Sequence, residues 1–102
     1  MSQSLADGYS FEREGTDSGV LLLKRQGVEL GRLDYRLATG VIYIDFVEVS
    51  PAKRGLGLGV RLVDAAADWA RESSRTLVPI CGYARRVLMS NAKYQDVFEG
   101  GR

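Results

Sequence analysis

The residues whose types and spacing most clearly indicate a chemical function form a glycine-rich segment in the middle of the chain, Arg54-Gly55-Leu56-Gly57-Leu58-Gly59. Glycines at alternate positions leave backbone N–H groups unshielded by side chains. An apolar run precedes the segment and a helical spacing of apolar side chains follows it, so the glycines lie in a turn from a strand into a helix. The partial positive charge of the helix N-terminus adds to the exposed amides. The segment therefore predicts a cradle for a pyrophosphate group.

Two familiar phosphate-binding motifs do not fit this segment. A P-loop requires lysine and then serine or threonine after its last glycine, but valine and arginine follow Gly59. A dinucleotide fingerprint starting at Gly55 or Gly57 requires glycine at position 60 or 62, where valine and leucine stand. The spacing that remains is R-x-x-G-x-G, as Arg54, Gly57 and Gly59. A glycine turn that only lets a helix pack closely is the alternative interpretation.

Apolar patterning on both sides of the segment predicts the elements that position it. Residues 41–49 form a long run of β-branched and aromatic residues, typical of a central strand buried on both faces. Residues 60–70 carry apolar side chains at helical spacing, and this helix should end near residues 72–74. Residues 76–80 are expected to form another strand, parallel to the central one because a helix separates the two.

The segments before the central strand are apolar runs joined by short turns, which predicts antiparallel hairpins. The runs cover residues 20–25 and 28–38, and residues 9–14 are either a further strand or merely extended. In residues 28–38 the apolar alternation slips by one position around Gly31, which indicates a β-bulge.

After the second parallel strand, residues 82–91 are expected to form a helix that faces inward with Tyr83, Val87 and Leu88. Residues 94–98 form a short apolar stretch, interpreted as an edge strand. Residues 1–8 and 99–102 are expected to be disordered. The whole order predicts one α/β (α+β) domain over residues 1–102, with a mixed, mostly antiparallel sheet and helices packed against it.

Composition excludes several classes of function. Fourteen basic and 13 acidic residues give a net charge of +1 without a basic stripe, so we expect no nucleic-acid partner. The single cysteine excludes an intramolecular disulfide, and the absence of histidine removes the commonest metal ligand, so we expect no metal. No run is long enough to span a membrane and the first residues do not resemble a signal peptide. We therefore expect a soluble cytoplasmic protein without a membrane partner.

The glycine segment, together with the strand before it, resembles motif A of the GNAT acetyltransferase superfamily, whose loop holds the pyrophosphate of coenzyme A. Over about residues 21–97 the chain is similar to a short, stand-alone branch of predicted N-acetyltransferases. That branch carries H-T-E-V, P-x-C-x-[YF] and H-P-E-Y, which here read Phe46-Val47-Glu48-Val49, Pro79-Ile80-Cys81-Gly82-Tyr83 and Asn91-Ala92-Lys93-Tyr94. The glutamate, the cysteine and both tyrosines are retained, whereas Phe46 and Asn91 replace the two histidines.

The resemblance implies a GNAT-like fold in which the two parallel strands splay apart and the pantetheine arm of acetyl-CoA lies in the gap. It also implies acetyl-CoA as the cosubstrate and transfer of the acetyl group to an amine of a small molecule or peptide, which these residues do not identify. The residues expected to bind the cofactor are Val47, Val49, Lys53, Arg54, Gly55, Leu56, Gly57, Leu58, Gly59, Tyr83, Asn91 and Tyr94.

Acetyl transfer needs a base that frees the lone pair of the amine, and the central strand offers two acids. Asp45 and Glu48 should point to opposite faces unless a bulge intervenes. A carboxylate in such an apolar strand should have a raised pKa. Glu48 is the favoured base and Asp45 the second choice. The alternative is that Glu48 is ion-paired with Lys53, Arg54 or another cation.

Cys81 is the second catalytic candidate, because the resemblance places its sulfur beside the thioester. It could act as a nucleophile, with Arg85 or Arg86 supplying a cation, or as a proton donor to the departing thiolate. The alternative is a small buried side chain. Tyr83 and Tyr94 are either proton donors or packing residues.

Three functions remain to be compared. The favoured one is an acetyl-CoA-dependent N-acetyltransferase. The second is a noncatalytic acyl-CoA-binding or sensing module, suggested by the loss of both branch histidines. The third is a protein-interaction domain, against which the intact glycine loop argues. The oligomeric state stays open, with a monomer compatible with the sequence.

Overall fold

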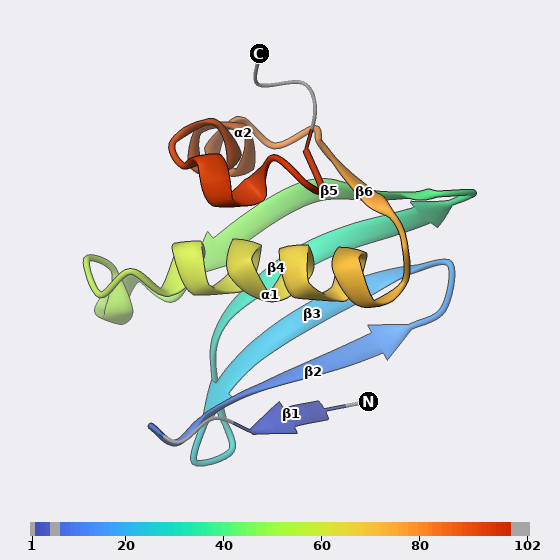
Figure 1. Cartoon of the computed structure of the whole chain (residues 1–102). Helices are drawn as coiled ribbons and strands as arrows, with labels where there is room; N and C mark the ends of the chain where they lie inside the picture. The colour runs from blue at the N-terminus through green and yellow to red at the C-terminus, as the bar shows by residue number, and fades with distance from the viewer. Residues whose placement is uncertain (1, 5–6, 99–102) are drawn as a thin grey trace.

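One six-stranded sheet, with the strands in sequence order, runs through the computed structural model, which describes residues 2–4 and 7–98 (Figure 1). The strands are β1 (Ser2–Ser4), β2 (Tyr9–Gly15), β3 (Ser18–Arg25), β4 (Val28–Ala38), β5 (Val41–Val49) and β6 (Thr76–Pro79). The helices are α1 (Leu58–Glu72) and α2 (Gly82–Met89), with 3-10 helices at Pro51–Lys53 and Ala92–Tyr94. No helix in this part of the chain is long and apolar enough to cross a membrane.

The sheet is mixed and mostly antiparallel, as the sequence predicts. β1 to β5 pair antiparallel in order, and β6 pairs parallel to β5 because α1 connects the two strands. Residues 9–14 belong to a full strand. The expected disorder is wrong for Ser2–Ser4, which pair with β2 and so satisfy backbone hydrogen bonds at the sheet edge. Residues 1, 5, 6 and 99–102 lie outside the described residues.

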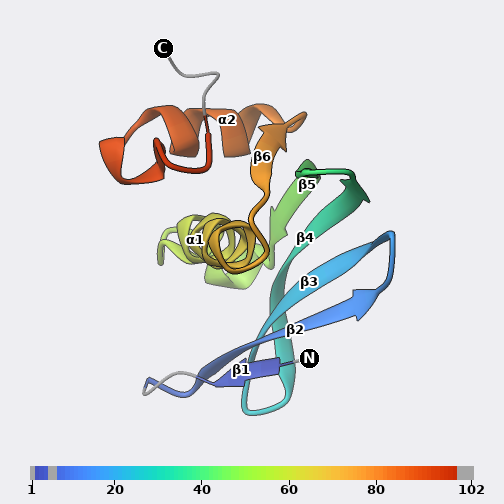
Figure 2. The ribbon, with the colours of Figure 1, turned by 45° about the vertical axis from the view of Figure 1, so that its right-hand side comes forward.

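The core lies between the sheet and the two helices, which share one face of the sheet (Figure 2). The α1 side chains at helical spacing that face the sheet are fully buried: Leu62, Val63, Ala66, Ala67 and Ala70. In β5, Ile42 and Ile44 have no exposed surface, whereas Phe46 is 48% exposed. The expected burial of β5 on both faces is therefore wrong, because the face away from α1 has no helix over it.

Two β-bulges set the phase of the strands beside the site. In β4, Leu30 is the extra residue next to Gly31, which confirms the predicted bulge. A second bulge lies in β5, where Ile44 pairs with Tyr35 and Phe46 with Asp34, so that Asp45 is extra. Beyond this bulge Val47 packs against the core. Glu48 consequently points to the face away from α1.

The end of the described chain is a turn, so the predicted edge strand at residues 94–98 is wrong. The N–H groups of Val97 and Phe98 donate to the carbonyl of Tyr94 at 3.0 and 2.9 Å, which is local bonding and not a sheet ladder. Only the Leu77 N–H donates to Val97, at 2.7 Å. Val97 and Phe98 are buried, so this turn covers the outer edge of β6.

Candidate active site

β6 pairs with only the first half of β5. Val41 to Ile44 pair with Thr76 to Pro79. The Ile44 carbonyl then accepts from the N–H of Ile80 at 2.9 Å and of Cys81 at 3.1 Å, after which the chain turns into α2. β5 continues to Val49, so its second half has a free edge among the described residues. This is the splay that the resemblance implied.

The loop between β5 and α1 exposes backbone amides at the end of that free edge. Gly55 and Gly57 have φ of +86° and +75°, a left-handed conformation that other residues adopt only with strain. Gly57 is the N-cap of α1 without a side-chain cap, and its carbonyl accepts from the Arg61 N–H at 3.2 Å. The three N–H groups at positions 58–60 precede that bond and have no partner within the helix. They can therefore donate to an anionic ligand.

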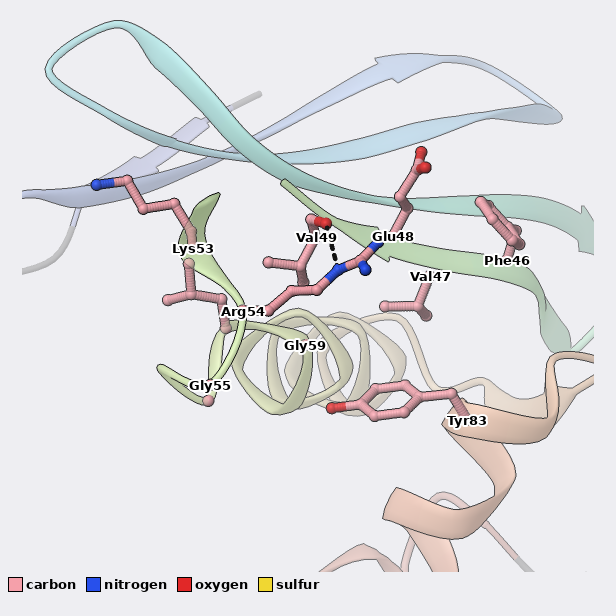
Figure 3. Close-up of a pocket in the computed structure, with 11 residues that line it drawn as sticks. Phe46, Val47, Glu48, Val49, Lys53, Arg54, Gly55, Gly59 and Tyr83 are labelled. Carbon is pink, nitrogen blue, oxygen red and sulfur yellow. Dashed lines mark hydrogen bonds between the residues drawn. The ribbon is translucent and has the colours of Figure 1, made fainter. Parts of the chain in front are cut away.

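A pocket of about 490 Å³ lies between the free edge of β5, this loop and α2 (Figure 3). It brings together nine of the twelve residues expected to bind the cofactor, together with Glu48. The residues that line it are Phe46, Val47, Glu48, Val49, Lys53, Arg54, Gly55, Gly57, Leu58, Gly59 and Tyr83. Phe46 lines the pocket but was not among the site residues predicted from the sequence. Its position two residues before Glu48, on the same face of the strand, could have indicated it.

Tyr83 forms the pocket wall opposite β5 by packing on the first turn of α1. A Cβ added to Gly59 would lie only 2.5 Å from the Tyr83 hydroxyl oxygen, so this close approach requires glycine. Burial raises the pKa of Tyr83, and the charge of Arg86 partly opposes this effect. The phenol is therefore protonated at neutral pH and can donate a hydrogen bond into the pocket.

Two cations stand at the rim of the pocket. Lys53 and Arg54 are both exposed, and the Arg54 Nε donates to the carbonyl of Val49 at 3.4 Å (Figure 3). A long, exposed side chain can turn toward a bound phosphate at little cost. The site thus combines oriented amides with mobile positive charges, which is the chemistry that a pyrophosphate needs.

The two candidate bases lie in different environments. Asp45 accepts from Arg36 Nε at 2.6 Å and Nη2 at 2.8 Å. That ion pair lowers the pKa of Asp45, so the expectation of a raised pKa is wrong there: the bulge turns the carboxylate toward Arg36 on the open face. Glu48 is exposed and makes no hydrogen bond or salt bridge to any residue in the described part of the chain. Its freedom favours Glu48 over Asp45 as the base.

The remaining predicted site residues do not line the pocket. Cys81 is the N-cap of α2, partly buried against the core. Asn91 caps the last 3-10 helix by accepting from the Lys93 N–H at 2.9 Å. Tyr94 is buried and donates to Asp64, and burial followed by this bond raises the pKa of Tyr94. Leu56 is exposed at the loop tip. Catalysis by Cys81 and cofactor contacts of the other three stay predictions.

The sequence model of the family described as GCN5-related N-acetyl-transferase matches residues 20–97, which include the whole pocket. The chain belongs to this family. Its fold is similar to the solution structure of a GCN5-like protein from Staphylococcus aureus, with 27% identity, a TM-score of 0.69, and 88% of this chain and 87% of that chain covered. As a member of the GCN5-related N-acetyltransferase family, the protein is an acetyltransferase. No curated protein matches it.

Two larger proteins from Brucella melitensis share the fold. One is a GNAT family acetyltransferase in complex with acetyl-CoA, with 25% identity and a TM-score of 0.53, covering 67% of this chain and 50% of that chain. The other is a ribosomal-protein-alanine N-acetyltransferase, with 23% identity and a TM-score of 0.60, covering 74% and 63%. The present chain thus matches only about half to two thirds of these proteins.

Proposed function

We propose that the protein transfers an acetyl group from acetyl-CoA to an amine. The observation that carries this proposal is the free edge of β5, which leads through the loop of residues 50–57 to an α1 N-terminus without a side-chain cap. The pyrophosphate would bind the amides of residues 58–60 and the two rim cations. The pantetheine arm would lie along the free edge at Val47 and Val49. There it would take the place of a partner strand and bind the free backbone N–H and C=O groups. A pocket of about 490 Å³ is of the size expected for such a ligand.

The chemistry assigned to the site follows from the groups that remain unpaired. The thioester supplies an activated acetyl group, and the amine nitrogen attacks its carbonyl carbon. Glu48 takes the proton that the amine must lose, and a free backbone N–H of β5 donates to the oxyanion. The carbon–sulfur bond then breaks and the departing thiolate takes up a proton. Tyr83, protonated and on the pocket wall, is one donor for it.

Cys81 is the other proton donor proposed for the thiolate. Its N–H makes the last of the hydrogen bonds that join this segment to β5, so its backbone lies where the splay begins. We expect Cys81→Ala to fold and bind acetyl-CoA but to lose activity by about tenfold or more. Mass spectrometry after acetyl-CoA treatment should show at most partial acetylation of the wild-type thiol. Full activity of the variant would leave Cys81 with packing alone.

The proposed function is tested by titrating acetyl-CoA calorimetrically and then measuring free thiol release with a panel of amines, polyamines and peptides. Binding together with amine-dependent release is the expected result. Binding without release for any amine would support the noncatalytic acyl-CoA module, which the exposed Phe46 at the branch histidine position favours. Absence of binding would contradict both.

A further inference from the structure

The first turn of α1 has little in its own sequence that holds it in place. Its N-cap, Gly57, makes no side-chain cap bond, and no acidic side chain in the turn interacts favourably with the helix dipole. Gly59, inside the turn, is an unfavourable residue in a helix. The free amides of residues 58–60 belong to this turn, so the contacts that fix the turn also aim these amides.

Other elements fix this turn from two sides. Tyr83 of α2 lies against Gly59, where an added Cβ would come within 2.5 Å of the Tyr83 hydroxyl oxygen (Figure 3). Arg61 leaves the helix on the opposite side, because two residues correspond to about 200° around a helix. The Arg61 N–H donates to the Gly57 carbonyl at 3.2 Å, which closes the turn. Arg61 therefore connects the turn to the groups that bind its side chain.

The side chain of Arg61 is held at the start of β2. Its Nη1 donates to Asp7 Oδ2 at 2.6 Å and its Nη2 to Asp7 Oδ1 at 3.4 Å. Its guanidinium also lies over the Tyr9 ring, 4.4 Å from the centroid. Asp7 is itself fixed, because its Oδ1 accepts from the Tyr9 N–H at 3.3 Å and Tyr9 pairs with Arg25 in the sheet. The ion pair thus joins the first turn of α1 to the sheet.

We propose that Asp7 is a positioning residue for the cofactor: it holds Arg61, and through Arg61 it fixes the free amides of α1 before the ligand arrives. This inference rests on the proposed function, which takes these amides as the pyrophosphate site. Asp7 is not among the residues that line the pocket, so it acts on the cofactor through the turn. Amides that are already aimed lose less freedom on binding, and a turn that loosens lowers the apparent affinity.

Charge and positioning predict opposite effects of Asp7→Asn on affinity. Removing a carboxylate and releasing Arg61 beside a phosphate site should tighten acetyl-CoA binding if charge alone matters. Loss of positioning should instead weaken binding by about threefold, the size expected for an exposed ion pair. Calorimetry and steady-state kinetics should therefore show a dissociation constant and a KM for acetyl-CoA raised about threefold, with kcat unchanged.

Two further variants show whether this ion pair is responsible. Asp96→Asn removes the carboxylate that Arg71 in the last turn of α1 binds at 2.6 and 3.1 Å, and it should keep wild-type affinity. In the Arg61→Gln background, Asp7→Asn should no longer weaken binding, because the bond is already absent. Tighter or unchanged binding in Asp7→Asn, or an equal loss in Asp96→Asn, would overturn the inference.

A measurement on the ligand-free protein separates this inference from the proposed function. The ¹H–¹⁵N heteronuclear NOE values of the amides of residues 58–60 should be lower in Asp7→Asn than in the wild type, and those of the last turn of α1 should not change. Absence of acetyl-CoA binding to the wild type would contradict the proposed function and, with it, the role of Asp7 toward the cofactor. Normal binding by the wild type, with unchanged affinity and NOE values in Asp7→Asn, would overturn the inference alone.

Discussion

The two halves of β5 have different roles although they belong to one strand. Val41 to Ile44 are paired on both sides, by β4 and β6, and supply two fully buried side chains to the core. Phe46 to Val49 are paired only by β4 among the described strands and line the pocket. The bulge at Asp45 lies at the boundary. A strand can thus be anchored at one end and leave its backbone available to a ligand at the other.

The first half should dominate stability, and this is the largest effect we expect. Ile44 has no exposed surface, so Ile44→Ala should lower the free energy of unfolding by about 3 kcal/mol through lost burial and a residual cavity. Phe46→Ala in the second half, where the ring is half exposed, should cost less than about 1 kcal/mol. Urea denaturation of both variants measures the difference. Equal losses would contradict the division of β5 into two roles.

The second half should dominate turnover. Glu48→Gln should lower kcat by roughly 100-fold while leaving acetyl-CoA affinity nearly unchanged, because the base is lost but the phosphate contacts remain. Asp45→Asn is the matched control: its carboxylate is held by Arg36, so kcat should stay within about threefold of wild type. A larger loss in Asp45→Asn than in Glu48→Gln would transfer the role of base to Asp45.

The loop after the second half should determine affinity for the cofactor. At Gly57, φ is +75° and a Cβ would meet nothing within 4 Å, so the expected effect of a side chain is backbone strain and not a clash within the protein. Gly57→Ala should weaken acetyl-CoA binding about fivefold to tenfold, from roughly 1 kcal/mol of strain that moves the amides. Gly40→Ala has the same strain (φ +76°) and the same open space in the β4–β5 turn. It should lose similar stability and keep wild-type affinity by calorimetry.

The strand, the glycine loop and the helix that form the site could be predicted from the sequence, because the signals for each of them are local. The β-branched run, the spacing of the glycines and the helical period around Leu62 are each contained in a short window of sequence. The bounds of β5 were predicted correctly, whereas its burial was not. Burial of β5 on one face depends on where the two helices pack. The residues next to the strand in the sequence do not carry that information.

The bulge at Asp45 was a stated possibility without a position. Its place depends on pairing with β4, a relation between segments that the sequence does not display directly. The same relation decides that Arg36 meets Asp45 and not Glu48. The capping role of Asn91 was missed for a related reason, because its partner, the Lys93 amide, is set by the last turn. A packing role was one of the two alternatives for Tyr94, but its partner Asp64 was not predicted, because that contact depends on packing against α1.

The smallest expected effect is a pH-dependent contribution to stability from Asp45, the residue at the boundary between the two halves of β5. The Arg36 ion pair lowers the pKa of Asp45 in the folded protein, so the pair stabilises the fold above the unfolded pKa of about 3.9. That stabilisation is lost as the pH falls through the lowered pKa. Because the pair is partly exposed, it should contribute less than about 1 kcal/mol. Denaturation of Asp45→Asn should therefore show a small loss at neutral pH that disappears in acid. A loss in Asp45→Asn that is the same at neutral and acid pH would contradict the stabilising role of this ion pair.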